Sequence, residues 1–211
     1  MYKALLCDLD GTLADTEPQH CSAWLHLLAE RYDRHYDEHW FEQWVGTSDT
    51  VVAKWLIEET GLEVEAEDII LEKQELFHRE VRADGRAFPG VAEQLARITA
   101  EYPLAIATNS HRPDADVVVP ALGLDRYTDV VTTASDVEHL KPAPDIYLLA
   151  AERLAVDPRA CIAIEDSTPG GDSARAAGCY VIGLNERVTA ADEIVADNGA
   201  ALARAYDLLR G

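Results

Sequence analysis

Hydrophobic residues along this chain gather into five short continuous runs, each bounded by polar or turn-forming residues. Continuous apolar runs are typical of parallel strands covered on both faces, whereas half-exposed strands alternate. The runs occupy residues 4–7, 104–107, 130–132, 161–164 and 180–182. Apolar positions with helical spacing follow the later runs, at residues 91–101, 114–122, 145–154 and 171–177. This alternation predicts right-handed βαβ units in a doubly wound, Rossmann-like α/β core with a parallel sheet.

A stretch of about seventy residues interrupts that rhythm after the first strand and is far longer than an ordinary crossover. Its apolar residues recur three or four positions apart and predict four helices, over residues 18–32, 38–45, 48–61 and 67–82. Pro18 suits the first turn of the first helix, and Gly61 suits the end of the third. The sequence therefore predicts an all-helical cap subdomain, residues 16–85, inserted into an α/β core formed by residues 1–15 and 86–211.

The charge balance of the chain restricts its partners. Acidic residues outnumber basic ones by 39 to 18 across 211 residues, giving a formal net charge of −21. Because such a field repels phosphate backbones, we expect no nucleic-acid partner. Lysine stands only at positions 3, 54, 73 and 141. A high-salt habitat or a GC-rich genome would explain this bias, and the simpler alternative is an acidic enzyme of an ordinary mesophile. We expect a monomer or a small homo-oligomer.

The cysteines and the lengths of the apolar segments indicate where in the cell we expect the protein. The four cysteines form no C-x-x-C pair and lie in apolar stretches, which favours buried thiols in a reducing environment over a zinc site or disulfides. Asp8 and Asp10 come before any apolar segment of signal-peptide length has formed, and no run of 18 apolar residues occurs. We therefore expect a cytoplasmic protein without membrane association.

Two carboxylates mark the end of the first predicted strand. Asp8 and Asp10 follow residues 4–7 directly, and ligands of open α/β sheets bind at the carboxyl ends of the strands. The simpler alternative is an Asp/Gly-rich turn. A calcium loop is excluded, because Leu13 and Gln19 stand where its pattern requires glycine and glutamate.

Three further polar groups follow later predicted strands in chain order. They are Thr108-Asn109-Ser110, Lys141, and Glu165-Asp166. Each has an ordinary alternative: a helix cap, a solvated loop lysine and an acidic N-cap, respectively.

Together with Asp8 and Asp10, these groups fit phosphoryl transfer. That reaction needs a nucleophile, neutralisation of the phosphoryl oxygens and a proton source for the leaving oxygen. Because a carboxylate nucleophile repels a phosphate dianion, a hard cation is required. Asp8, the backbone carbonyl of Asp10, and Asp166 could hold Mg²⁺, while Lys141 and the Thr108 hydroxyl could complete the cradle.

With these residues in this order, the sequence resembles the haloacid dehalogenase superfamily, and within it the β-phosphoglucomutase-like phosphatases that carry a helical cap. The matching segments are Asp8-Leu9-Asp10-Gly11-Thr12, Thr108, Lys141, Glu165-Asp166 with Gly170, and Phe88-Pro89-Gly90-Val91. The resemblance implies that Asp8 is the nucleophile and forms an aspartyl-phosphate. It implies that Asp10 protonates the leaving oxygen as general acid and then acts as base for the attacking water. It also implies that Glu165 either binds the metal directly or contacts the residues that do.

The cap residues carry a weaker resemblance. Thr16, His20 and the Gly46-Thr47-Ser48 turn look like the substrate-binding parts of members that act on phosphosugars. Asn109 and Ser110 are further candidates for substrate binding. His20 could equally be a surface histidine of an amphipathic helix. His35 and His39 lie one helical turn apart, a spacing that can bind zinc, but we interpret them as solvated surface residues.

The combined hypothesis is a Mg²⁺-dependent phosphatase that hydrolyses a small phosphorylated metabolite, a sugar phosphate, through an aspartyl-phosphate. The first alternative is a β-phosphoglucomutase-type mutase. In mutase members an arginine follows the Gly-x-Ser turn, whereas Asp49 stands here; Lys73 or Arg79 could take over that role. The second alternative is a non-catalytic binding protein on the same fold, which the intact set of motif residues disfavours.

Overall fold

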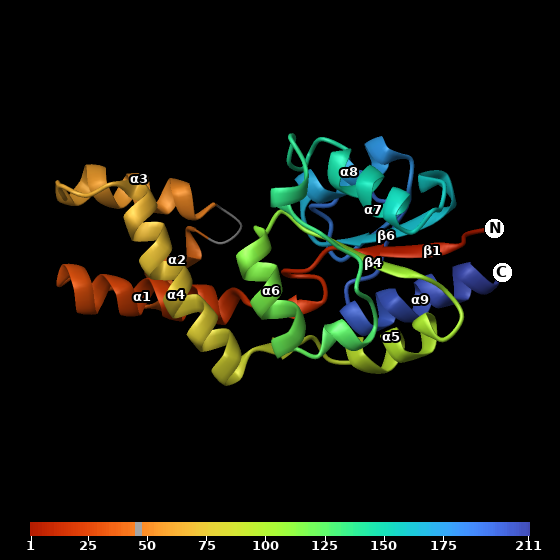
Figure 1. The fold of residues 1–211 in the computed structure, drawn as a ribbon, viewed down its shortest axis with the longest axis horizontal. Helices are drawn as coiled ribbons and strands as arrows, with labels where there is room; N and C mark the ends of the chain where they lie inside the picture. The colour runs from red at the N-terminus through yellow and green to blue at the C-terminus, as the bar shows by residue number, and fades with distance from the viewer. Residues whose placement is uncertain (45–47) are drawn as a thin grey trace. The chain divides into compact units, whose positions relative to one another are not determined.

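The computed structural model describes residues 1–44 and 48–211 and divides them into two compact units. Residues 1–15 and 86–211 form the first unit, which we call the core. Residues 16–85 form the second, which we call the cap. Figure 1 shows the helices and strands of both. In the described part of the chain, no helix is both long and apolar enough to cross a membrane.

A six-stranded parallel sheet forms the centre of the core, with strand order β5-β4-β1-β6-β7-β8. The strands are β1 (Ala4–Cys7), β4 (Leu104–Ala107), β5 (Val131–Thr132), β6 (Cys161–Glu165), β7 (Tyr180–Gly183) and β8 (Glu193–Ile194). Since β1 lies in the middle and the chain adds strands on both sides of it, the sheet is doubly wound, which confirms the predicted fold class. Leu6 of β1 pairs with Ala105 on one side and with Ala163 on the other.

Helices cover both faces of this sheet. Helices α5 (Val91–Thr99) and α9 (Asn198–Arg210) pack together on one face, and α7 (Asp145–Arg153) and α8 (Thr168–Ala177) pack together on the other (Figure 1). Helix α6 (Arg112–Ala121) follows β4. Three short 3-10 turns complete the core: η1 (Leu124–Arg126), η2 (Ala134–Asp136) and η3 (Pro158–Ala160).

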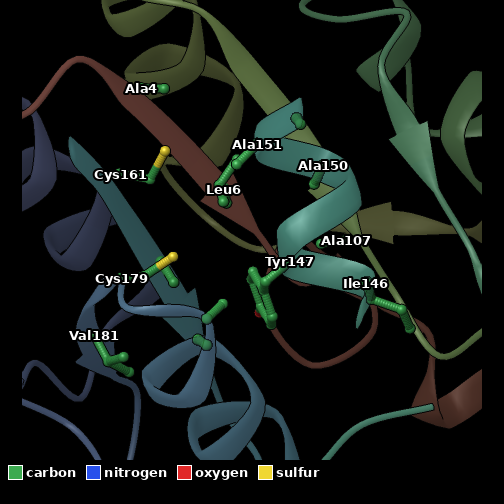
Figure 2. Close-up of a cluster of buried hydrophobic side chains, with 14 of the residues drawn as sticks. Ala4, Leu6, Ala107, Ile146, Tyr147, Ala150, Ala151, Cys161, Cys179 and Val181 are labelled. Carbon is green, nitrogen blue, oxygen red and sulfur yellow. The ribbon is translucent and has the colours of Figure 1, made fainter. Parts of the chain in front are cut away.

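Small residues bring α7 close to the sheet. Figure 2 shows Ala150 and Ala151 of α7 beside Leu6 of β1, all with side chains excluded from solvent. Tyr147 lies on the same helix and is also fully buried. Because alanine adds little width, α7 sits near enough to the strands for the Tyr147 side chain to reach the sheet edge.

A second, two-stranded sheet marks the places where the chain leaves and re-enters the core. Strand β2 (Ala14–Asp15) pairs antiparallel with β3 (Arg86–Ala87). These strands are two residues long, and the hydrophobic pattern did not predict them, because so short a segment shows no periodicity.

In the described part of the cap, residues 16–44 and 48–85, the chain forms four helices: α1 (Glu17–Tyr32), α2 (Glu38–Glu42), α3 (Asp49–Thr60) and α4 (Ala66–Asp84). They enclose their own apolar cluster, which includes Trp24, Leu28, Leu56 and Ile69. Gly61 ends α3 with φ 66°, a backbone conformation that glycine adopts without strain. The helix expected over residues 38–45 is shorter than predicted, since α2 ends at Glu42.

Two elements near the C-terminus, β8 and α9, were not predicted. The signal for α9 is present in the sequence, since Ala201, Leu202, Ala205 and Leu209 have helical spacing and are buried. Asp197 caps the helix by accepting a hydrogen bond from the Ala200 N–H at 2.7 Å. Strand β8 spans two residues, too few to recognise from sequence.

Candidate active site

The candidate chemical groups of the core come together at the carboxyl edge of the sheet. Asp8 directly follows β1, Thr108 follows β4, and Glu165 and Asp166 end and follow β6. Strands β4, β1 and β6 are neighbours and all parallel. Their carboxyl ends therefore meet at one place, which is where ligands bind to sheets of this type.

Lys141 reaches the centre of this edge from the loop that precedes α7. Its Nζ lies 2.6 Å from Oδ1 of Asp8 and 2.6 Å from Oε1 of Glu165. The side chains are buried, with 3% of Lys141, 10% of Asp8 and 0% of Glu165 exposed. Burial by itself disfavours the charged ammonium, but Asp8 and Glu165 outweigh it and raise the pKa of Lys141 above its ordinary value. A protonated Lys141 is therefore held beside the Asp8 carboxylate.

The Glu165 carboxylate is occupied by donors from the protein. Oε1 accepts hydrogen bonds from Lys141 and, at 2.8 Å, from the Tyr147 hydroxyl, while Oε2 accepts one from the Ser167 hydroxyl at 3.0 Å. Gly170 lies against this carboxylate, and a Cβ there would overlap it. Burial together with Glu165 and Asp8 raises the pKa of Tyr147 well above its ordinary value, so its hydroxyl remains a donor.

An acidic cluster suited to a divalent cation lies beside this pair. Asp8, Glu165 and Asp166 each offer a carboxylate oxygen, and these oxygens lie within 4.8 Å of one another. An all-oxygen donor set is what Mg²⁺ prefers. Since Glu165 is engaged by Lys141, Tyr147 and Ser167, the residues best placed to act as ligands are Asp8 and Asp166.

Asp166 is fixed in this cluster from two directions. Its backbone oxygen accepts a hydrogen bond from Asn185 Nδ2 at 2.6 Å, and its carboxylate lies against Gly11, where an added Cβ would stand 2.5 Å from Oδ2. Gly11 has φ 81°, which glycine adopts without strain. Burial, with a contribution from Glu165, raises the pKa of Asp166 to about 6. A nearby cation would relieve this electrostatic strain.

The turn that carries Asp10 is held by residues distant in sequence. The Ser110 hydroxyl donates to Oδ2 of Asp10 at 2.6 Å. Asn198, at the start of α9, donates to the backbone oxygens of Gly11 at 3.2 Å and Thr12 at 2.8 Å. The carboxyl group expected to transfer protons is thus contacted from the loop after β4, and the turn that follows it is held from the start of α9.

Thr108 and Asn109 contact the same edge in different ways. The Thr108 hydroxyl accepts a hydrogen bond from the Ser110 N–H at 3.0 Å, which leaves its own hydrogen for donation to another group. Oδ1 of Asn109 accepts from the Lys141 backbone N–H at 3.0 Å, and Nδ2 donates to the Lys141 carbonyl at 3.5 Å. We predicted Asn109 and Ser110 as substrate-binding residues; their side chains contact Lys141 and Asp10.

A separate polar cluster lies within the cap, around Lys73. The Lys73 side chain is fully buried, and its Nζ lies 2.6 Å from Nδ1 of His20 and 2.8 Å from Oδ2 of Asp49. The indole N–H of Trp24 donates to the other Asp49 oxygen at 3.1 Å, and the His20 ring stacks on Phe77. His20 therefore has defined contacts within the cap, to Lys73 and Phe77.

The other cap candidates have less defined surroundings. Thr16 is almost completely buried and precedes α1, and Ser48 is exposed at the start of α3. Gly46 and Thr47 lie outside the described residues. His35 and His39 are largely exposed and pair with Asp33 and Glu42, respectively, which agrees with the surface interpretation.

Sequence reasoning missed three residues that orient the site: Tyr147, Asn185 and Asn198. Tyr147 carries no distinguishing signal, because its apolar body fits the buried face of a helix whatever its hydroxyl does. Asn185 lies in a loop and Asn198 begins a helix next to its cap, and asparagine is common in such segments. Only the contacts described above separate them from ordinary residues of those kinds.

Comparison with known proteins agrees with this arrangement. A family model described as haloacid dehalogenase-like hydrolase matches residues 2–178. Fructose-1-phosphate phosphatase YqaB of Escherichia coli (strain K12) is 33% identical over 177 residues, covering 84% of this chain and 93% of the relative. A phosphorylated carbohydrates phosphatase of Thermotoga maritima is 30% identical over 181 residues, covering 83% of this chain and 82% of the relative.

A solved structure is similar to this chain over almost its whole length. The crystal structure of a candidate β-phosphoglucomutase from Thermotoga maritima superposes with a TM-score of 0.85 at 29% identity, covering 98% of this chain and 100% of that one. The family resemblance expected from the motifs is thereby confirmed. The chain belongs to the haloacid dehalogenase-like hydrolase family.

Proposed function

We propose that this protein is a Mg²⁺-dependent phosphatase that hydrolyses a small phosphorylated metabolite, a sugar phosphate, by way of an aspartyl-phosphate on Asp8. The observation that carries the proposal is the placement of Asp8. Its carboxylate stands at the carboxyl edge of the sheet, 2.6 Å from the buried ammonium of Lys141 and in one oxygen cluster with Asp166.

Each step of the reaction has a residue suited to it. A carboxylate oxygen of Asp8 attacks phosphorus as the bond to the leaving oxygen breaks, and Asp10 gives its proton to that oxygen. Lys141 and the Thr108 hydroxyl neutralise negative charge on the phosphoryl oxygens. Mg²⁺ held by Asp8, the Asp10 carbonyl and Asp166 would supply further positive charge to the same oxygens. Asp10 then removes a proton from the water that releases phosphate and regenerates Asp8.

The substrate class is supported by the relatives. Proteins similar to this chain are named for fructose 1-phosphate and for phosphorylated carbohydrates. The strongly negative chain argues for a small substrate rather than a polyanionic nucleic acid. We therefore propose a sugar phosphate as the substrate.

The charges within the cap favour the phosphatase over the mutase. A mutase must hold a second phosphate group, and that dianion is best gripped by a cation such as arginine. Asp49 stands where the mutase arginine is expected, and the ammonium of Lys73 lies 2.8 Å from Asp49 with its side chain fully buried. Arg79 is largely exposed and has Glu80 within 3.9 Å. The positive charge of Lys73 is thus already matched within the cap.

The test is a screen for phosphate release over sugar phosphates, phosphoglycolate and nucleotides, with and without Mg²⁺. We expect release from one or more sugar phosphates that stops when a chelator removes the metal. Asp8→Asn should abolish release because an amide cannot act as the nucleophile, and Asp10→Asn should lower it about 10²–10⁴-fold. Near-normal turnover by folded Asp8→Asn would refute the mechanism. A wild type that only binds these compounds would support the non-catalytic alternative.

A further inference from the structure

Tyr147 is a residue of the candidate active site that none of the family motifs includes. It lies on α7 (Figure 2) and is fully buried, and its hydroxyl reaches Glu165 at the carboxyl end of β6. The hydroxyl donates to Oε1 of Glu165 at 2.8 Å. The same oxygen accepts a hydrogen bond from Nζ of Lys141 at 2.6 Å. One carboxylate oxygen therefore links a tyrosine on α7 to the lysine that contacts Asp8.

This shared oxygen gives the tyrosine influence over the lysine. A carboxylate oxygen that accepts two hydrogen bonds divides its negative charge between two donors, so it attracts each of them less than it would attract one alone. The Tyr147 ring also lies below the ammonium of Lys141, 5.0 Å from Nζ to the ring centroid. The hydroxyl and the ring thus act on the same cation, one through Glu165 and one directly.

We propose that Tyr147 is a positioning residue for Lys141 and that its hydroxyl acts through Glu165. The hydrogen bond holds the Glu165 carboxylate in place and draws off part of its charge, which leaves more of the positive charge of Lys141 for Asp8 and for the phosphoryl group in transit. Tyr147 needs no contact with the substrate for this role. The inference rests on the proposed phosphatase function for its kinetic consequence.

The competing explanation is that Tyr147 only fills space. Its ring lies in the apolar cluster between α7, α8 and the sheet, together with Leu6, Ala150 and Ala174. If packing were its whole role, phenylalanine would replace it without effect on catalysis. Tyr147→Phe therefore separates the two explanations, because it keeps the ring and removes only the donor.

A matched control exists in the same unit. The Tyr206 hydroxyl on α9 also donates to a glutamate, Oε1 of Glu101 at 2.6 Å, and Tyr206 is buried as well. We expect Tyr147→Phe to lower kcat about tenfold, the loss expected when a hydrogen bond to a charged group is removed, and to change KM little. Tyr206→Phe should leave both parameters unchanged. A kcat for Tyr147→Phe equal to that of Tyr206→Phe would overturn the proposal.

A double-mutant cycle tests whether Tyr147 acts through Glu165. In a Glu165→Gln background, Tyr147→Phe should have little further effect on kcat, because the carboxylate that relays its influence is gone. A full tenfold loss in that background would show that Tyr147 acts by another route and would refute the proposal. If Glu165→Gln does not fold, the NMR signal of Lys141 decides instead, and a signal that Tyr147→Phe leaves in place would refute the proposal.

A spectroscopic measurement keeps this inference separate from the proposed function. The chain has four lysines, at positions 3, 54, 73 and 141, so lysine labelled with ¹³C at the ε-carbon gives four NMR signals, and Lys141→Met identifies that of Lys141. Tyr147→Phe should shift this signal and Tyr206→Phe should not. A Lys141 signal that stays in place would refute the inference. A wild type that releases no phosphate would refute the proposed function alone.

Discussion

Lys141→Met should cost the protein far more stability than the loss of an ordinary salt bridge. The substitution keeps an unbranched side chain of similar length and removes one positive charge. It would leave Asp8 and Glu165, with 10% and 0% of their side chains exposed, as neighbouring carboxylates without their cation. Removing one partner of a buried ion pair costs about 3–5 kcal/mol, because the remaining charge stays desolvated.

The expected loss of stability in Lys141→Met can be compared with that for an exposed ion pair of similar geometry, Arg204 with Glu193. Arg204 Nε lies 2.9 Å from Glu193, but their side chains are 43% and 26% exposed, and such surface pairs contribute about 0–1 kcal/mol. For a chain of this length, about 2–4 °C in Tm corresponds to 1 kcal/mol. Lys141→Met should therefore lower Tm by roughly 10 °C, and Arg204→Met by no more than about 4 °C.

The stability lost in Lys141→Met should depend on pH, and the pKa of Asp8 gives the direction. Burial raises the pKa of Asp8 well above its ordinary value even with Lys141 present to lower it, and Lys141→Met would raise it further. Between the unfolded and folded pKa values, the folded state of this variant binds a proton that the unfolded state does not. Its stability should therefore recover as pH falls from 7.5 towards 5.

Thermal unfolding followed by circular dichroism, for both variants and the wild type at several pH values, measures this prediction. Adding Glu165→Gln to Lys141→Met should restore part of the loss, because it removes one of the two buried negative charges. If Lys141→Met melts no lower than Arg204→Met, or if its deficit is the same at pH 5 and pH 7.5, the account of a buried ionised cluster is wrong.

Three further predictions concern the metal and the substrate. Since the pKa of Asp166 is raised to about 6 by burial, Mg²⁺ affinity measured by calorimetry should fall as pH is lowered from 7.5 to 5.5; an affinity independent of pH would argue against Asp166 as a ligand. Gly11→Ala places a Cβ 2.5 Å from Oδ2 of Asp166 at φ 81°, so it should lower Tm and weaken Mg²⁺ binding, and unchanged binding would contradict the packing argument. β-Glucose 1-phosphate with catalytic glucose 1,6-bisphosphate should give no appreciable glucose 6-phosphate with the wild type, and Asp49→Arg should strengthen binding of bisphosphorylated sugars; isomerisation faster than phosphate release would overturn the phosphatase assignment.

Local pattern was enough to predict the parallel sheet and its chemical edge. The apolar runs of β1, β4 and β6 are buried and continuous, and a run of that kind is characteristic of a strand covered on both faces. Once those strands are parallel neighbours, their carboxyl ends must meet, which brings Asp8, Thr108 and Glu165 together. That these three strands are neighbours was decided by the fold, because chain order and the handedness of βαβ units leave several strand orders open.

What each of these side chains touches was decided by tertiary structure alone. Tyr147 and Glu165 are 18 positions apart, Lys73 and Asp49 are 24 apart, and Asn198 lies 187 positions from Gly11. Hydrogen bonds of this kind depend on the packing of whole helices against the sheet or against each other, and hydrophobic periodicity carries no information about the tip of a buried polar side chain. The sequence alone thus identified the strands β1, β4 and β6 and the chemical groups that follow them. Only the tertiary structure shows that Glu165 accepts hydrogen bonds from Tyr147 and Lys141, and that the charge of Lys73 is paired with Asp49.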